Sequence, residues 1–159
     1  MERLEKSMAD IVALMEQPLE EGKEVALTIR GNSMWPLLRS AQDKIFLKKL
    51  DFYKIYDIIL YKRDNGSYVL HRIVGEKNGA FYLAGDGEFK KEYPIYNNQI
   101  VAGAVGGVRK GKPFSCAGLP YRIYSRVWTA ILPIRPYIVH IVAPVRRRLK
   151  DVFKKHGRN

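Results

Sequence analysis

Apolar side chains follow a helical spacing over the first part of the chain. Acidic side chains occupy the opposite face of this pattern, and Pro18 interrupts it. Residues 1–24 are therefore predicted to form an amphipathic helix that lies on a folded domain and ends at Pro18. Its apolar positions are Leu4, Met8, Ile11, Val12 and Met15.

From residue 25 onward the apolar pattern changes to short runs rich in Val, Ile, Leu and Tyr. Turn-forming pairs such as Asn65-Gly66 and Asn78-Gly79 separate these runs, with no helical pattern between them. Short strands joined by tight turns predict a mainly β fold, a coiled antiparallel β domain that we place at residues 25–115. The expected strands are 25–29, 44–48, 57–61, 68–74, 81–84 and 100–108.

Residues 116–159 combine an apolar and aromatic segment with a polybasic tail, and we expect a helical, apolar-basic extension here. Aliphatic side chains favour membrane insertion by about 0.3 to 0.6 kcal/mol each, whereas a central arginine such as Arg135 costs about 2.5 to 3.5 kcal/mol. His140 and three prolines add to the cost of a span. We therefore expect residues 119–155 to lie on an anionic membrane surface without crossing it.

In this interfacial arrangement Tyr121, Tyr124 and Trp128 would lie at the level of the lipid headgroups, with the basic residues 146–155 facing anionic lipid. Packing of the same segment against the β domain is the alternative. Residues 1–30 contain no run of about 20 apolar residues, which is the length that a membrane span requires. Any attachment to a membrane is therefore expected in the C-terminal region.

Charge and composition narrow the possible partners. The net charge is +12, and residues 146–159 supply +6 of it, from seven basic residues and one acidic residue. A polybasic tail after an apolar segment favours anionic lipid, so no specific nucleic acid is expected. With 47% hydrophobic residues the chain can build a core. Cys116 is the only cysteine, which excludes an internal disulfide and the small secreted scaffolds that depend on them.

Three residues of the β region could together carry out nucleophilic catalysis. Ser33 follows Gly31-Asn32, a pair that turns the chain sharply after a strand and would expose the hydroxyl. His71 is the only histidine of the β region and, by strand alternation, shares a face with Val69 and Ile73. Asp86 ends a later strand and could orient the imidazole. Each signal alone is more typical of an ordinary turn or core residue.

The order and spacing of five short motifs resemble those of the signal peptidase I superfamily, which also contains the self-cleaving SOS repressors. The resemblance covers residues 25–108, and the ordered set is more specific than any one motif. The motifs are Gly31-Asn32-Ser33-Met34-Trp35-Pro36, Ala41-Gln42-Asp43-Lys44-Ile45, Tyr56-Asp57-Ile58-Ile59-Leu60, His71-Arg72-Ile73-Val74 and Gly85-Asp86-Gly87.

The resemblance implies a serine endopeptidase with a signal-peptidase-like β domain. The sequence His71-Arg72-Ile73 matches the type that pairs serine with histidine, where other members use lysine. Ser33 would then be the nucleophile and His71 the general base, and Asp86 matches the aspartate that would orient the imidazole. If the base were a lysine instead, Lys62 or Lys44 would be the candidates. Small residues are expected beside the scissile bond.

Four positions depart from the pattern of that superfamily. Gln42 stands where glycine usually precedes Asp43, and Gly87 replaces the usual asparagine. The acidic residue six positions beyond Asp86 is usually aspartate and is Glu92 here. Gly31 has no hydroxyl for an oxyanion hole, so we expect the backbone N–H of Ser33 and the Asn32 side chain as donors.

The predicted substrate is an extended segment of a protein or peptide, bound along a strand edge near Met34 and Trp35, which we expect to be exposed. No cofactor is implied, and no metal either, because the histidines have no partners at ligand spacing. The predicted location is membrane-associated, at the cytoplasmic membrane, on a side that the sequence leaves open. The alternatives are a non-catalytic membrane-surface or nucleic-acid adaptor, a repressor-like cytoplasmic protease and, remotely, Cys116 as nucleophile.

Overall fold

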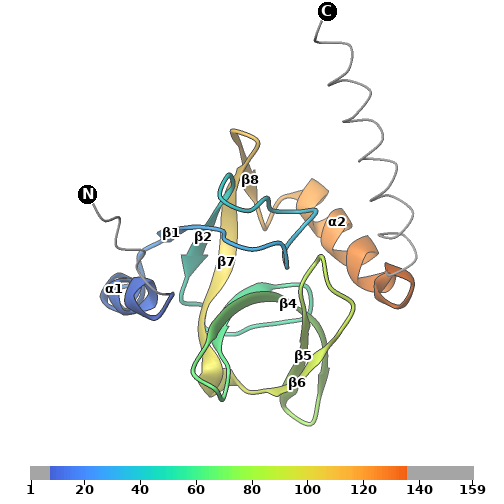
Figure 1. The fold of residues 1–159 in the computed structure, drawn as a ribbon, viewed down its shortest axis with the longest axis horizontal. Coiled ribbons are helices and arrows are strands. Elements are labelled where there is room, and N and C mark those ends of the chain that lie inside the picture. Colours follow the sequence, from blue (N-terminus) through green and yellow to red (C-terminus); the bar gives the residue numbers. More distant parts are fainter. Residues whose placement is uncertain (1–7, 136–159) are drawn as a thin grey trace, which may run out of the picture.

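In the computed structural model, described here for residues 8–135, eight antiparallel strands form one continuous sheet between two helices. The strands pair in the order β1-β2-β7-β3-β4-β5-β6, and β8 also pairs with β7. Figure 1 shows α1 and α2 on opposite sides of the β structure, while β4, β5 and β6 curl into a lobe of their own. The prediction of a mainly β, antiparallel fold is confirmed.

The elements are α1 Met8–Glu20, β1 Val25–Thr28, β2 Lys44–Lys48, β3 Ile58–Lys62, β4 Tyr68–Lys77, β5 Ala80–Ala84, β6 Glu92–Ile95, η1 Asn97–Gln99, β7 Ile100–Arg109, β8 Lys112–Ser115, α2 Leu119–Ala130 and η2 Leu132–Ile134. All six expected strands are present. The expected end of the first helix at Pro18 is wrong, because α1 continues through Pro18 to Glu20.

Two strands, β6 and β8, were not predicted. Each contains a proline, Pro94 in β6 and Pro113 in β8, and proline cannot donate a hydrogen bond to a neighbouring strand. Both strands lie at the margins of the sheet, β6 at the end of the order and β8 beside β7. In an edge strand the N–H group that proline lacks is not needed for pairing. Proline is therefore compatible with β6 and β8, although it argues against a central strand.

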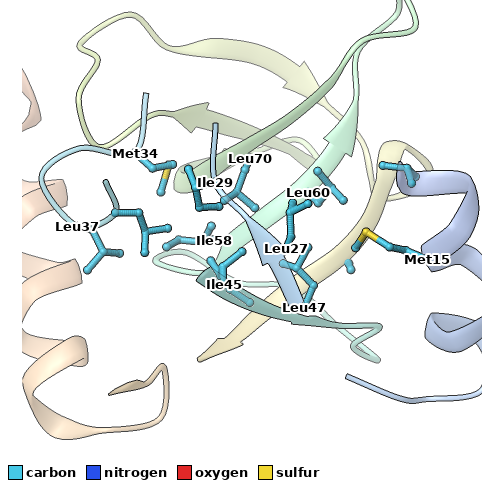
Figure 2. Packing of buried hydrophobic residues seen from close by; sticks show 14 of the residues in the cluster. Met15, Leu27, Ile29, Met34, Leu37, Ile45, Leu47, Ile58, Leu60 and Leu70 are labelled. Carbon is cyan, nitrogen blue, oxygen red and sulfur yellow. The ribbon is translucent and has the colours of Figure 1, made fainter. Parts of the chain in front are cut away.

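The buried side chains form two clusters, one on each side of the shared strands β3 and β7. The larger lies beneath β1, β2 and α1, and the smaller fills the curl of β3 to β6 around Ile59, Ile73 and Leu83. In Figure 2, Met15 of α1 lies at one end of the larger cluster, while Met34 and Leu37 lie at the other. The segment that carries Ser33 is thereby fixed to the core on both sides of its turn.

Met34 is fully buried, with 1% of its surface exposed. The expectation that this side chain is exposed for substrate is therefore wrong. Met34 packs among Ile29, Leu38 and the other residues of the larger cluster, and this packing attaches the Ser33 turn to the core. Trp35 is half-buried.

The segment after β8 packs on the β domain through its aromatic face. Tyr121 is buried, and Tyr124 and Trp128 are half-buried against the turn that follows β5. The three side chains thus pack on the β domain, which is the arrangement that the alternative expectation described, while the expected contact of residues 119–155 with lipid stays a prediction. In the described part of the chain, no helix is long and apolar enough to cross a membrane. The polybasic tail and His140 lie outside the described residues.

Candidate active site

The turn that carries Ser33 is held at its base by a buried carboxylate. Asp43 is 1% exposed and accepts hydrogen bonds from the backbone and the guanidinium of Arg39 and from the backbone N–H of Lys110. The Arg39 side chain is the main reason that the pKa of Asp43 falls to about 2. Asp43 therefore joins the end of the Ser33 segment to the turn between β7 and β8.

Ser33 itself lies half-buried in a tight turn after β1. Gly31 has a φ of +83°, a conformation that glycine adopts without strain, and the Trp35 N–H donates to the Asn32 carbonyl at 3.0 Å. Asn32 is exposed on this turn. Its use as an oxyanion donor stays a prediction.

The turn after β5 packs directly against the Ser33 turn, backbone to backbone. The Gly87 N–H donates to the Ser33 carbonyl at 2.7 Å. A Cβ added at Gly87 would lie only 2.7 Å from the Asn32 carbonyl oxygen, and one at Gly85 only 2.4 Å from the Ser33 carbonyl oxygen. This contact explains why Gly87 stands where an asparagine was expected, because no side chain fits between the two turns.

Gly85 also borders His71. The Cβ position at Gly85 that lies 2.4 Å from the Ser33 carbonyl oxygen lies 3.2 Å from Nε2 of His71. The backbone of the predicted nucleophile and the ring of the predicted base therefore flank the same glycine. Among the described residues no hydrogen bond joins the Ser33 hydroxyl to His71, and hydrogen bonds between catalytic groups often tighten only when substrate is bound.

His71 is buried in the curl of the small lobe, with 1% of its surface exposed. As predicted, it shares its side of β4 with Ile73 and Val69. The Tyr61 hydroxyl lies 3.3 Å from Nδ1. Burial lowers the pKa of His71 to about 4, although the negative charge of Glu92 partly opposes the shift. The imidazole is therefore neutral at pH 7, as a proton acceptor must be.

Two carboxylates lie close to the ring nitrogens, and neither belongs to Asp86. Glu92 Oε1 lies 3.4 Å from Nδ1, and Glu88 Oε2 lies 3.4 Å from Nε2. Hydrogen bonds from the Arg63 guanidinium keep the pKa of Glu92 below its usual value, so this carboxylate is charged at neutral pH. Burial, and then repulsion by Glu92, raises the pKa of Glu88.

Asp86 has a different partner from the one that the sequence indicated. Its carboxylate is fully buried and accepts two hydrogen bonds from Arg72, at 2.8 and 2.7 Å, and one from the Tyr124 hydroxyl at 3.0 Å. Neighbouring residues of a strand point to opposite faces, so the Arg72 side chain lies on the face of β4 opposite the His71 ring. The Asp86 carboxylate, which binds Arg72, lies on that opposite face as well. Its predicted role as the group that orients His71 is not supported by any contact between the two.

The function of Asp86 in this structure is to fix the turn beside Ser33 to α2. Its backbone carbonyl accepts a hydrogen bond from Nε1 of Trp128 at 2.8 Å. Arg135, 1% exposed, donates to the carbonyl oxygens of Gly85 and Glu88. The helix and the turn that follows it thus hold the Gly85–Glu88 segment in place from outside the sheet.

Sequence reasoning left Glu88, Glu92 and Tyr61 out of the site. For Glu92 a signal existed, since the resemblance places an acidic residue six positions after Asp86. Tyr61 could have been found by pairing, because the register of β3 with β4 places it opposite Val69 and on the face of His71. Nothing in the sequence singles out Glu88, which lies in an irregular turn.

The other nucleophile and base candidates are less suited to catalysis. Burial raises the pKa of Cys116 to about 11, so its thiol stays protonated at neutral pH. Lys62 lies with its ammonium over the ring of Tyr68, and Lys44 is an exposed residue opposite Thr28. Among the described residues, no three histidine, cysteine or acidic side chains are grouped to hold a metal ion.

A groove of about 970 Å³ is lined by most residues of the segment 50–57, by Cys116 and by Tyr121, Arg122, Ser125 and Arg126 of α2. Neither Ser33 nor His71 lines it, so it is separate from the candidate active site. Comparison with models of known protein families and with curated proteins finds no match to this chain.

Proposed function

We propose that this protein is a serine endopeptidase of the signal peptidase type, with Ser33 as nucleophile and His71 as general base. The proposal rests on Gly85, whose Cβ position lies close to both the Ser33 carbonyl oxygen and Nε2 of His71. A buried, neutral imidazole next to a serine in a rigid turn is the arrangement that acyl transfer requires.

Glu92 takes the orienting role in this proposal. When the Nδ1 proton is directed to Glu92, Nε2 carries the lone pair of the ring and can accept the proton of the Ser33 hydroxyl in place of its contact with Glu88. The imidazolium that forms would be stabilised by the charged Glu92 carboxylate, which Arg63 holds in place. Glu92 is thus the aspartate equivalent of the triad, one methylene longer than its counterpart in the superfamily.

The reaction proceeds in two halves. The Ser33 oxygen attacks the scissile carbonyl while His71 removes its proton, and the protonated imidazole then donates that proton to the departing amine. Water then attacks the carbonyl of the resulting ester while His71 removes one of its protons, and the imidazolium returns that proton to the Ser33 oxygen as the ester bond breaks. The Ser33 backbone N–H, with the Asn32 side chain, would donate to the oxyanion.

An extended substrate fits the strand arrangement next to this site. β4 begins at Tyr68, but its pairing with β5 begins only at Arg72, so residues 68–71 pair with β3 on one side alone. Their other edge offers backbone hydrogen bonds directly before His71. A peptide that added itself there as a strand would bring its carbonyl groups along the Ser33 turn.

Peptide cleavage by matched serine variants tests the proposal. A mixture of peptides with small residues at varied positions is incubated with wild type, Ser33→Ala and Ser67→Ala, and new termini are identified by mass spectrometry. We expect wild type and Ser67→Ala to cleave equally and Ser33→Ala to lose at least about a thousandfold in rate. Cleavage that survives in Ser33→Ala, or no cleavage by wild type, contradicts the proposal and favours the non-catalytic adaptor.

Glu92→Gln separates the orienting role from that of Asp86. The amide keeps the shape of the side chain but removes the charge that stabilises the imidazolium, so we expect a loss of about a hundredfold or more in kcat with an unchanged fold. Asp86→Asn should instead reduce stability, because it leaves Arg72 buried without its counter-charge. A variant Glu92→Gln with full activity would assign the orienting role elsewhere.

A further inference from the structure

The outer face of α2 carries an aliphatic stripe that no described residue covers. Leu119, Ile123 and Val127 are four residues apart and therefore lie one above the other on the helix. They are 66%, 55% and 55% exposed, and Ile134 after the helix is 51% exposed. In Figure 1, α2 lies at the margin of the fold with one side turned away from the sheet.

The contacts of the inner face prevent this helix from turning its stripe inward. Arg72 donates to the Tyr121 hydroxyl at 3.0 Å, the Tyr124 hydroxyl donates to Asp86, and Trp128 donates to the Asp86 carbonyl. All three are directional hydrogen bonds to one buried cluster. The exposure of the stripe is therefore imposed by these contacts of the inner face.

The charges beside the stripe are of one sign. Arg122 and Arg126 are exposed along its edge, and α2 contains no acidic residue. Phe52 lines the same groove as these arginines and is 71% exposed. From Leu119 to the end of the sequence there are ten basic residues and one acidic residue. Any surface that meets the stripe must therefore tolerate, or attract, positive charge.

We propose that the outer face of α2, defined as Leu119, Ile123 and Val127 with Arg122 and Arg126, docks on the surface of an anionic lipid bilayer. Aliphatic side chains on one face of a helix with arginines at their border are the pattern of helices that lie in the membrane interface. Protein interfaces favour aromatic anchors instead, and the aromatic residues of this helix are used on its inner face. The phosphate backbone of a nucleic acid could pair with the arginines but would not bury the aliphatic stripe.

The lipid contact thus uses the opposite face of the helix from the one that the sequence indicated. Tyr121, Tyr124 and Trp128 bind the catalytic domain, and the aliphatic residues between them bind lipid. Because the inner face also holds the Gly85–Glu88 turn next to Ser33, docking would keep the candidate active site close to the membrane surface. Only this last consequence rests on the proposed function.

Vesicle sedimentation of the full-length chain tests the docking face with a matched pair of leucines. Leu119 and Leu14 lie on different helices and are 66% and 64% exposed, so Leu119→Ser and Leu14→Ser remove equal apolar surface. We expect Leu119→Ser to weaken partitioning into vesicles of equal parts phosphatidylcholine and phosphatidylglycerol about tenfold. Leu14→Ser should bind like wild type. Ile123→Ser/Val127→Ser should weaken binding further.

The charge contribution is tested in the same assay. Arg122→Gln/Arg126→Gln should bind more weakly than wild type, and binding to phosphatidylcholine alone should be weak for every variant. Lys77→Gln/Lys112→Gln removes two exposed charges from other faces and serves as the control. Ser33→Ala should bind like wild type, which separates docking from catalysis.

Three results would overturn the proposal. Wild type that does not sediment with anionic vesicles has no such docking face. Equal binding of wild type, Leu119→Ser and Ile123→Ser/Val127→Ser assigns the contact to another part of the chain. A wild-type dimer in light scattering that Leu119→Ser dissociates, without any vesicle binding, assigns the stripe to a second copy of the protein.

Discussion

Gly85→Ala is the change that most sharply perturbs the relation between Ser33 and His71. The new Cβ would lie 2.4 Å from the Ser33 carbonyl oxygen, 3.1 Å from the Ser33 carbonyl carbon and 3.2 Å from Nε2 of His71. An ordinary contact begins at 3.4 Å, so the Ser33 turn must retreat by the difference between 3.4 and 2.4 Å, about 1 Å. The backbone at Gly85 is not in the left-handed region, so the effect is one of space alone.

Overpacking of this kind costs about 1 to 3 kcal/mol of folding stability. The effect on catalysis should be larger, because a displacement of about 1 Å between nucleophile and base can reduce the rate about a hundredfold. Release of p-nitrophenol from the p-nitrophenyl ester of a blocked alanine peptide would report the acylation rate, and urea unfolding would report stability. We expect slow acylation by a variant that is still folded.

Gly75→Ala is the matched control, because its new Cβ would meet nothing closer than the Tyr82 ring at 3.5 Å. It should acylate like wild type. If Gly85→Ala acylated within about twofold of wild type, this contact would not position the Ser33 turn, and Gly85 would not set the distance between Ser33 and His71.

Further predictions concern pH and stability. The acylation rate should rise with pH through a midpoint below about 6.5, the ordinary value for histidine, because burial lowers the pKa of His71; a midpoint above pH 8 that survives His71→Ala would indicate a lysine base. His71 stabilises the fold in its neutral form, so this contribution should be complete above pH 6.5 and be lost as the pH falls toward 4, as acid titration of unfolding would show. Asp43→Ala should cost about 2 to 4 kcal/mol in urea unfolding, since it removes four hydrogen bonds to a buried carboxylate. In wild type the contribution of Asp43 should persist down to about pH 4 and disappear as the pH falls toward 2.

The strands and the face of His71 could be predicted because both depend on short-range periodicity. Alternation within β4 places His71 with Ile73 whatever the rest of the chain does. β6 and β8 were not predicted because Pro94 and Pro113 oppose strand formation. A proline is acceptable in these strands only because they lie at the margin of the sheet. Edge position is a property of the whole topology, which a local pattern does not contain.

The pairing of buried charged side chains could not be predicted from the sequence. Asp86 follows the strand next to His71, and its proximity in the chain suggested a contact. The structure pairs it with Arg72 instead, because a fully buried carboxylate is most stable with a bidentate guanidinium. Which of two acids reaches the histidine depends on the path of the turn from residue 85 to residue 92, and hence on contacts with α2 that lie far away in sequence.

The same limit applies to α2. Its sequence alternates aromatic and aliphatic residues on a basic background, and a helix of this kind fits a lipid surface or a protein surface equally well. Tyr121, Tyr124 and Trp128 determine which face of α2 packs on the β domain, because their polar ends form hydrogen bonds with Arg72 and Asp86. Aromatic side chains with a polar end suit such a boundary, but the sequence does not show which boundary it is.

Mapping the acyl-enzyme shows directly whether Ser33 is the nucleophile. Wild type is mixed with the p-nitrophenyl ester of a blocked alanine peptide, quenched in acid within the first turnover, and digested for mass spectrometry. We expect one added acyl group, carried by Ser33, and almost none in His71→Ala quenched at the same time. An acyl group on another residue, or an unchanged yield in Ser33→Ala, would contradict it.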